Sequence, residues 1–114
     1  MNILLTGGAG YIGSHTIIEL INSGHKVVVV DSLVNSSREA LRRVEQITEM
    51  TVPFYEADIR NKPALQAVFN DHSFDAVIHF AGLKAVGESV AQPLSYYDAN
   101  ITSTLVLLEV MEQY

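Results

Sequence analysis

Short apolar runs alternate with segments of helical periodicity along the chain, and this alternation predicts the order of its elements. The apolar runs predict strands over residues 3–5, 26–31, 51–58 and 74–82. The segments between them carry apolar residues at every third or fourth position and predict helices over residues 11–23, 36–47 and 61–69. A further amphipathic helix is expected from residue 94 onward. Its apolar stripe consists of Leu94, Tyr97, Ile101, Leu105, Leu108 and Met111.

Capping residues and one proline refine the predicted elements. Ser36 and Glu39 have the spacing of a capping box, so a helix is expected to begin there. Asn61 can cap the next helix. The four consecutive valines within residues 26–31 suit a strand that is covered on both faces. Pro53 has no N–H group to donate, which places its strand at an edge of the sheet.

The regular alternation of strand and helix predicts an α/β fold of the Rossmann type. Right-handed crossovers then give a parallel sheet with helices on both faces and the strand order 3-2-1-4. This order corresponds to one mononucleotide-binding half plus one strand, so the sheet is expected to be truncated before a fifth strand. Residues 1–114 are therefore expected to form a single, partial domain. Residues 6–13 and 80–84 would face each other at its switch point.

The composition narrows the classes of ligand. The 114 residues include 13 acidic and 7 basic side chains, a net charge of −6, without any block of like charge. This balance argues against a nucleic-acid partner and against an anionic membrane surface. The chain has no cysteine, and its 4 histidines lack the spacing of metal ligands, so no metal is expected. Because the amino terminus has no basic region followed by a long apolar stretch, a cytoplasmic protein is expected.

The stretch TGGAGYIG, residues 6–13, follows the first strand and opens the first helix. It fits two glycine patterns, GxGxxG counted from Gly8 and GxxGxxG counted from Gly7. In the second pattern Gly7 permits the turn, Gly10 lets a phosphate approach the backbone and Gly13 lets the helix pack closely. A helix amino terminus can hold a pyrophosphate through its free N–H groups. The context therefore favours dinucleotide binding over an ordinary glycine-rich turn.

Asp31 ends the second strand at about the twenty-residue offset at which dinucleotide-binding folds place an acidic residue. Its carboxylate can accept hydrogen bonds from both hydroxyls of an adenosine ribose and would repel a 2′-phosphate. No basic residue follows it before Arg38. The sequence therefore predicts NAD in preference to NADP. The alternative is an aspartate that merely terminates a strand.

Four features together resemble one enzyme family: the glycine turn, Asp31, ADIRN at residues 57–61 and HFAGLKAVGESV at residues 79–90. Over essentially its whole length the chain resembles the amino-terminal part of nucleotide-sugar 4-epimerases, which belong to the extended short-chain dehydrogenases/reductases. The resemblance implies interconversion of UDP-glucose and UDP-galactose through a 4-keto intermediate, with transient transfer of hydride to bound NAD. The segment GLKAVGES is the most diagnostic, because related dehydratases and decarboxylases carry other residues there.

The resemblance also implies which residues contact NAD. They are Gly7, Gly10, Tyr11, Ile12 and Gly13 at the pyrophosphate, Asp31, Asn35 and Ser36 at the adenosine ribose, Asp58 and Ile59 at the adenine, Phe80, Ala81 and Gly82 on the floor of the cleft, and Lys84 and Asn100 beside the cofactor. Lys84 would supply a positive charge that is otherwise scarce in this chain. His79 lies within the same motif, and a structural role is favoured for it over acid–base chemistry.

The catalytic Tyr-x-x-x-Lys pair of that family is not found in the sequence. The residues four positions after its tyrosines are His15, Ile59, Asn100 and Ile101, and Tyr114 is the last residue. No catalytic residue is therefore expected in this segment, which resembles a fragment without the region that binds the UDP-sugar. Two alternatives stay open, a stand-alone NAD-binding module and another extended-family enzyme such as a 4,6-dehydratase. The resemblance also implies a homodimer, formed by helix packing, as one form of assembly.

Overall fold

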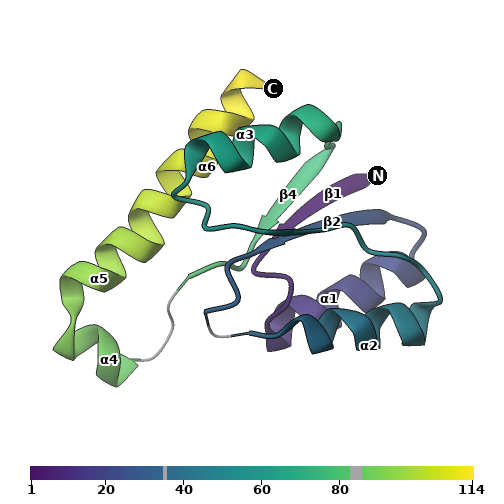
Figure 1. Cartoon of the computed structure of the whole chain (residues 1–114), viewed down its shortest axis with the longest axis horizontal. Coiled ribbons are helices and arrows are strands. Elements are labelled where there is room, and N and C mark those ends of the chain that lie inside the picture. The colour runs from purple at the N-terminus through teal and green to yellow at the C-terminus, as the bar shows by residue number, and fades with distance from the viewer. Residues whose placement is uncertain (35, 83–85) are drawn as a thin grey trace.

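The computed structural model describes residues 1–34, 36–82 and 86–114, which form a parallel sheet with helices on both faces (Figure 1). The strands of this described part are β1 (Asn2–Thr6), β2 (Lys26–Asp31), β3 (Phe54–Glu56) and β4 (Ala76–His79). Their order is β3-β2-β1-β4, and each neighbouring pair is parallel. The predicted α/β class and the predicted strand order are confirmed.

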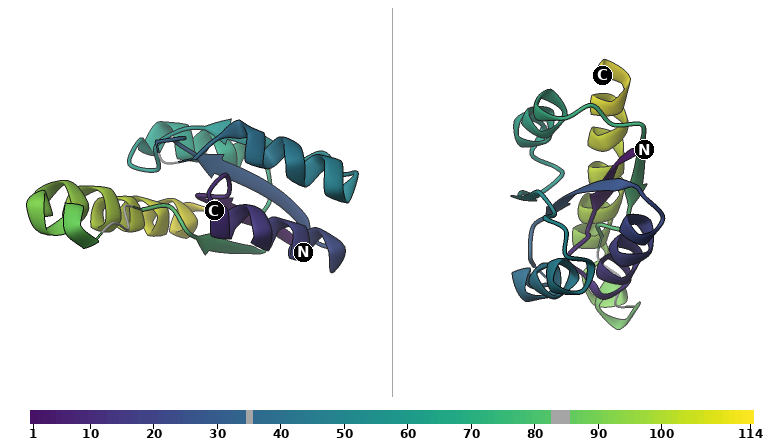
Figure 2. Two further views of the ribbon diagram at one scale, coloured as in Figure 1. Left: turned by 90° about the horizontal axis from the view of Figure 1, so that it is seen from below. Right: turned by 90° about the vertical axis from the view of Figure 1, so that its right-hand side faces the viewer.

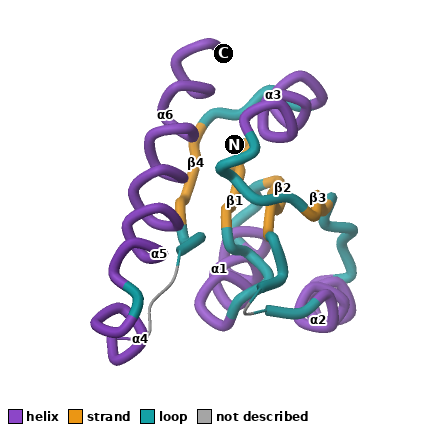
Figure 3. Tube along the Cα trace, turned by 60° about the vertical axis from the view of Figure 1, so that its left-hand side comes forward, coloured by secondary structure: helices purple, strands orange, loops and turns teal. Residues whose placement is uncertain are grey.

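Helices follow the strands and cover both faces of the sheet (Figure 3). They are α1 (Tyr11–Asn22), α2 (Arg38–Thr48), α3 (Lys62–Asp71), α4 (Val86–Ala91), α5 (Pro93–Tyr97), the π-helical turn η1 (Asp98–Thr102) and α6 (Ser103–Gln113). Helices α1 and α2 contact each other on one face, and α3 and α6 contact each other on the opposite face. Among the described helices, none is both long and apolar enough to span a membrane.

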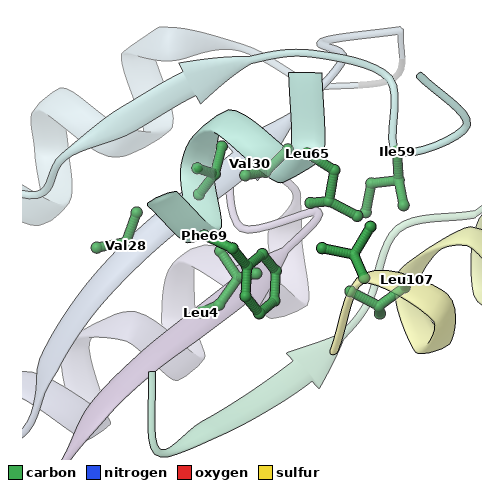
Figure 4. Packing of buried hydrophobic residues seen from close by; sticks show 9 residues of the cluster. Leu4, Val28, Val30, Ile59, Leu65, Phe69 and Leu107 are labelled. Carbon is green, nitrogen blue, oxygen red and sulfur yellow. The ribbon is translucent and has the colours of Figure 1, made fainter. Parts of the chain in front are cut away.

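The central strands β1 and β2 supply side chains to two hydrophobic cores, one on each face of the sheet. Toward α3 and α6, Leu4, Val28 and Val30 pack with residues that include Leu65 and Leu107 (Figure 4). The core toward α1 and α2 contains Leu5, Ile17, Val27, Val29, Leu41 and Val44. Successive side chains of a strand point to opposite faces, so a strand covered on both sides needs an unbroken apolar run. The valines of β2 confirm that prediction.

The two outer strands are shorter than the sequence predicted. β3 is limited to three residues because Pro53, just before it, has no N–H group; Pro53 contributes only its carbonyl oxygen, which accepts from Val29 N at 2.9 Å. The edge position predicted for this strand is confirmed. β4 is limited to Ala76–His79 and forms the other edge, with no further strand beside it in the described part of the chain.

Helix α2 begins later than the capping-box spacing predicted. Its N-cap is Ser37, whose Oγ accepts a hydrogen bond from Glu39 N at 3.1 Å. Ser36 instead donates its hydroxyl to Asp31 Oδ1 at 2.8 Å. The predicted capping box was therefore wrong, because a carboxylate from β2 engages the serine that was expected to cap the helix. The cap predicted for α3 at Asn61 is confirmed.

The long helix predicted from residue 94 onward is a run of α5, η1 and α6, with the short helix α4 before it (Figure 2). Neither α4 nor the π-helical turn was predicted from the sequence. Leu107 and Val110, which are 3% and 0% exposed, attach α6 to the core. The predicted apolar stripe lies on the outside instead. We call five of its six members the outer stripe: Leu94, Tyr97, Ile101, Leu105 and Leu108, each at least 51% exposed, whereas Met111 is 39% exposed.

Candidate functional site

The chain between β1 and α1 turns at Gly7, which alone among the glycines of residues 6–13 has a positive φ, +72°. A Cβ on Gly7 would lie 2.6 Å from the backbone nitrogen of Ala81, so the loops after β1 and β4 touch through their backbones. A Cβ on Gly13 would lie 2.4 Å from the carbonyl oxygen of Gly7. At Gly10 the nearest atom to such a Cβ is 3.4 Å away, which leaves room there. This geometry supports the pattern counted from Gly7.

The amino terminus of α1 lies directly after this turn. Gly10 is its N-cap, without a side-chain cap, and Ser14 N donates to Gly10 O at 2.9 Å. The N–H groups before Ser14 in the first turn therefore have no acceptor within the helix. Tyr11 and Ile12 lie in this turn and are exposed. Free N–H groups and the helix dipole act together at such an end, which makes it suited to an anion.

Asp31 joins the glycine turn to the loop that precedes α2. Its side chain is buried, and Oδ2 accepts a hydrogen bond from Ala9 N at 3.0 Å. Oδ1 accepts from Leu33 N and from Ser36 Oγ, each at 2.8 Å. The structure therefore brings together Asp31 and Ser36, two of the residues predicted at the ribose. Their hydrogen bonds fix the orientation of the carboxylate at the carboxyl end of β2.

The loop after β4 packs on the end of β1. Phe80 N donates to Thr6 O at 2.9 Å, and Ala81 N donates to Thr6 Oγ1 at 3.3 Å. Gly82 has a φ of +154°, and a Cβ there would lie 2.9 Å from Asn100 Oδ1. The predicted floor residues and Asn100 are therefore gathered beside the glycine turn, although Asn100 comes from a helix far along the chain.

The residues predicted at the adenine already have partners within the chain. Asp58 accepts hydrogen bonds from Arg60 Nε at 3.0 and 3.1 Å. These bonds from the guanidinium lower the pKa of the Asp58 carboxyl, outweighing the opposing effect of desolvation. Ile59 is 4% exposed and packs in the core with Leu65 and Leu107, so its backbone is the part that a ligand can meet. The adenine contacts of Asp58 and Ile59 stay predictions.

Arg60 is a residue near the site that the sequence analysis missed. Its guanidinium pairs with Asp58 and also with Asp98, the first residue of η1. The hydrogen bonds that Arg60 donates to Asp58, and secondarily to Asp98, raise the pKa of Arg60 above its ordinary value. The pairs tie the loop between β3 and α3 to η1. The ADIRN motif drew attention to this loop, but no local pattern identifies Asp98 as a partner.

The imidazole of His79 is hydrogen-bonded through both ring nitrogens, which was not predicted from the sequence. Its Nδ1 is hydrogen-bonded to Thr6 Oγ1, and its Nε2 lies 3.2 Å from Thr104 Oγ1. Thr6 and His79 are partners in the register of β1 and β4, so the predicted strand order already made them neighbours. Thr104 is brought to them by α6. These contacts agree with the structural role favoured for His79.

Two of the predicted cofactor residues, Asn35 and Lys84, lie outside the described residues. Within the described ranges, no three side chains of histidine, aspartate or glutamate cluster in a way that could hold a metal ion. The described part of the candidate site is thus built from backbone groups, one buried carboxylate and hydroxyl and amide side chains. Such a set can bind a polar, anionic ligand at the carboxyl edge of the sheet.

Comparison with known proteins finds related proteins over almost the whole chain. The model of the NAD dependent epimerase/dehydratase family matches residues 3–114. The chain is 60% identical over 114 residues to a UDP-glucose 4-epimerase of Bacillus subtilis (strain 168), covering 100% of this chain and 34% of that protein. It is 53% identical over 111 residues to a UDP-glucose 4-epimerase of Klebsiella pneumoniae, covering 97% of this chain and 80% of that protein.

A solved structure shows the same backbone arrangement. The UDP-glucose 4-epimerase of Bifidobacterium longum, determined in complex with NAD+ and UDP, has a TM-score of 0.98 to this chain at 56% sequence identity. The match covers 99% of this chain and 34% of that structure. The chain therefore spans about a third of the length of this structure and of the Bacillus subtilis relative.

Proposed function

Because this chain belongs to the NAD dependent epimerase/dehydratase family, we propose that it forms the NAD-binding portion of a UDP-glucose 4-epimerase. The proposed reaction interconverts UDP-glucose and UDP-galactose through a 4-keto intermediate. NAD, when bound, supplies the acceptor and donor of hydride, and a UDP-sugar is the proposed substrate. The proposal is supported by relatives that carry this name and by one of them whose structure contains NAD+ and UDP.

One observation carries the NAD assignment: three features suited to a dinucleotide meet at one edge of the sheet. The N–H groups at Tyr11 and Ile12 in the first turn of α1 would hold the pyrophosphate. The carboxylate of Asp31 would hold the adenosine ribose. Gly7 has no side chain, so the backbone of the turn lies directly against that of Ala81. Asp31 fits only if it accepts ribose hydroxyls in addition to, or in place of, its present donors.

Calorimetric titration of the 114-residue chain with NAD and with NADP tests this assignment. NAD is expected to bind at least tenfold more tightly, roughly 1.4 kcal/mol, because the carboxylate of Asp31 repels a 2′-phosphate. Asp31→Ala is expected to reduce the difference in affinity between NAD and NADP. Asp75→Ala is the control, since Asp75 also accepts a backbone hydrogen bond, from Asn2 N at 2.7 Å, but at the opposite end of β1. A chain that binds neither nucleotide, or prefers NADP, contradicts the assignment.

The catalytic step needs groups that this sequence does not supply. No tyrosine in it is followed four positions later by lysine. We therefore propose that this chain binds the cofactor, and that the proton transfers of the reaction depend on residues outside it. A stand-alone NAD-binding module would share the same geometry. The gene sequence downstream of Tyr114 distinguishes the epimerase from the stand-alone module: codons for Tyr-x-x-x-Lys support the epimerase, whereas a stop codon supports the module.

The names of the two relatives described above argue against the dehydratase alternative, since both are UDP-glucose 4-epimerases.

Two copies of the chain are proposed to associate through the outer stripe. This stripe consists of five exposed apolar side chains along the run from α5 to α6, and Leu94 and Tyr97 are 80% and 61% exposed. Isolated apolar side chains are ordinary on a surface, but a contiguous apolar row usually marks a contact region. The family resemblance implies a homodimer, so we propose that a second copy of the chain covers the outer stripe. The cytoplasmic location stays a prediction from composition.

A further inference from the structure

A chain of hydrogen bonds crosses the molecule from the glycine turn to the π-helical turn. It begins at Ala81 N, which donates to Thr6 Oγ1 at 3.3 Å. Thr6 Oγ1 is bonded to Nδ1 of His79, and Nε2 of His79 lies 3.2 Å from Thr104 Oγ1. Thr104 Oγ1 then donates to Asn100 O at 2.7 Å. The chain thus joins β1 and β4 to the consecutive elements η1 and α6, which come later in the sequence.

The bond that Thr104 donates to Asn100 indicates which ring nitrogen of His79 carries a proton. Thr104 has one hydroxyl hydrogen, and it is donated to Asn100 O. The contact between Thr104 Oγ1 and His79 Nε2 therefore requires the hydrogen to be on Nε2. In a neutral imidazole Nδ1 is then an acceptor, which matches the single hydroxyl hydrogen of Thr6. Thr6 is completely buried, so a polar group there needs its partners.

The far end of this chain is the part of the fold that carries Asn100. The turn η1 is π-helical over Asp98–Thr102, an uncommon conformation that recurs at functional sites. Its geometry places Asn100 Oδ1 where a Cβ on Gly82 would be 2.9 Å away. The near end of the chain holds Ala81, whose backbone touches Gly7. The imidazole therefore sits between the two sides of the proposed NAD cleft.

We propose that His79 is a positioning residue for cofactor binding, acting as the neutral Nε2–H tautomer. It sets the distance between the loop after β4 and the turn that carries Asn100, and it acts through Thr6 and Thr104 without touching NAD. This inference rests on the proposed NAD site. It differs from an acid–base role, because both ring nitrogens are engaged by hydroxyl groups of the chain. The helices would pack on the sheet without the imidazole, but the cleft would lose its fixed width.

The tautomer is tested first, on the unliganded chain, so the result does not depend on NAD. Nitrogen-15 NMR of the histidine rings is expected to show His79 protonated at Nε2 and unprotonated at Nδ1. Thr104→Val, which removes the acceptor for Nε2–H, is expected to shift the His79 ring resonances and the backbone resonances of Asn100 and Ala81 together. A wild-type ring that is protonated at Nδ1, or doubly protonated, overturns the proposal.

Cofactor affinity is tested second, with a matched control. Ser103 Oγ also donates to Asn100 O, at 3.3 Å, but it is not linked to His79 by a described bond. Thr104→Val is expected to weaken NAD binding about tenfold, and Ser103→Ala by less than about threefold, because only the first breaks the link. Thr104→Ser, which keeps the hydroxyl, is expected to retain wild-type affinity. Equal losses in Thr104→Val and Ser103→Ala overturn the proposal, as does a loss in Thr104→Ser that matches Thr104→Val.

The two tests separate this inference from the proposed function. If the wild-type chain bound no NAD, the NAD assignment would fail, and the NMR result would still decide the tautomer. If NAD bound normally and Thr104→Val had no effect, the NAD assignment would stand and the positioning role of His79 would fail. Should Thr104→Val unfold the chain, Thr6→Val removes the hydroxyl on the other side of the ring and is expected to weaken NAD binding, whereas Thr6→Ser keeps that hydroxyl and is expected to retain wild-type affinity. Equal NAD affinity of Thr6→Val and Thr6→Ser overturns the proposal.

Discussion

Individual residues at the carboxyl edge of the sheet have their identity set by the space around them. Gly13 faces the carbonyl oxygen of Gly7 so closely that any Cβ would displace the turn, whereas Gly10 has room above it. The same glycine repeat therefore combines two requirements, one for packing and one for open space. Asp31 shows a similar combination, since its carboxylate is both a structural acceptor for Ala9 N and the proposed ribose ligand.

Gly13→Ala is expected to destabilise the chain by about 2 kcal/mol. The added Cβ would lie 2.4 Å from Gly7 O and 2.7 Å from Gly8 Cα, and both are backbone atoms that cannot rotate away. Gly87→Ala is the control, because a Cβ on Gly87, also in a helix, meets nothing within 4 Å. Urea unfolding should show a lower midpoint for the first variant and an unchanged or higher one for the second. Equal midpoints would refute the packing argument.

Arg60→Met is expected to raise the pKa of Asp58 toward its ordinary value. The bonds from Arg60 lower this pKa in the folded state. The pair therefore stabilises the fold fully at pH values above the ordinary carboxyl pKa near 4, and this stabilisation is lost as the pH falls through the lowered pKa. The side chains of Arg60 and Asp58 are 38% and 42% exposed, so solvent screening keeps the gain below about 1 kcal/mol.

Two measurements check that expectation. Carbon-13 NMR of the Asp58 carboxyl gives its pKa directly in wild type and variant. Urea unfolding at several pH values should show a stability difference between the two that is present near neutral pH and shrinks in acid. Arg42→Met is the control, since Arg42 pairs with Glu39 on the surface of α2 and not with Asp58. An Asp58 pKa that is the same in wild type and Arg60→Met would remove the argument.

At the scale of elements, the run from α4 to α6 departs most from the pattern that predicted it. A stripe of apolar residues usually marks the core-facing side of a helix, but here the core contacts come from Leu107 and Val110 on another side. The outer stripe is left in solvent. The π-helical turn between α5 and α6 is held by Arg60 at its start and by Thr104 beyond its end.

Self-association through the outer stripe is the prediction that follows at this scale. Sedimentation velocity is expected to show a dimer whose fraction grows with concentration. Replacing Leu105 and Leu108, each 55% exposed, by lysine is expected to give a monomer at all concentrations, because charges would be desolvated in the contact. Val90→Lys, at a position on α4 that is 78% exposed and outside the outer stripe, should behave as wild type. A wild-type chain that stays monomeric throughout would exclude this contact.

At the scale of the whole molecule, the described chain carries the proposed NAD-binding edge, and β4 forms one lateral margin of its sheet. β4 is the last strand of the described sheet. It pairs with β1 on one side, and α6 covers one of its faces (Figure 3). A strand at the margin of a sheet can pair with a further strand. The molecule therefore places the proposed NAD-binding elements at the carboxyl edge of the sheet, with β4 at one lateral margin of the described part.

The purified 114-residue chain is expected to show no epimerisation of UDP-galactose even with saturating NAD. The reaction needs a base to take the sugar hydroxyl proton, and none of the five tyrosines has a lysine partner at the required spacing. A coupled assay for UDP-glucose measures the rate, and NAD binding by calorimetry shows that the same sample is folded and competent to bind. Turnover above the rate without protein would contradict this expectation.

Sequence by itself determined the class of fold, the strand order and the backbone of the glycine turn. These features depend on local periodicity, on valine runs such as that of β2 and on glycines such as Gly7, whose conformational freedom is a property of the residue. The family resemblance added a set of cofactor residues, of which Gly7, Asp31 and Gly82 gather at one edge of the sheet. Local sequence patterns therefore sufficed to predict those features that depend on residues close together in the sequence.

Tertiary structure decided what depends on residues far apart in the chain. It paired Arg60 with Asp98, gave Ser36 to Asp31 in place of the helix cap, and joined His79 to Thr104. It also turned the outer stripe to solvent. No periodicity encodes these outcomes, because a hydrogen bond or an ion pair between distant residues forms only after the sheet and its helices have brought them within about 3 Å of each other.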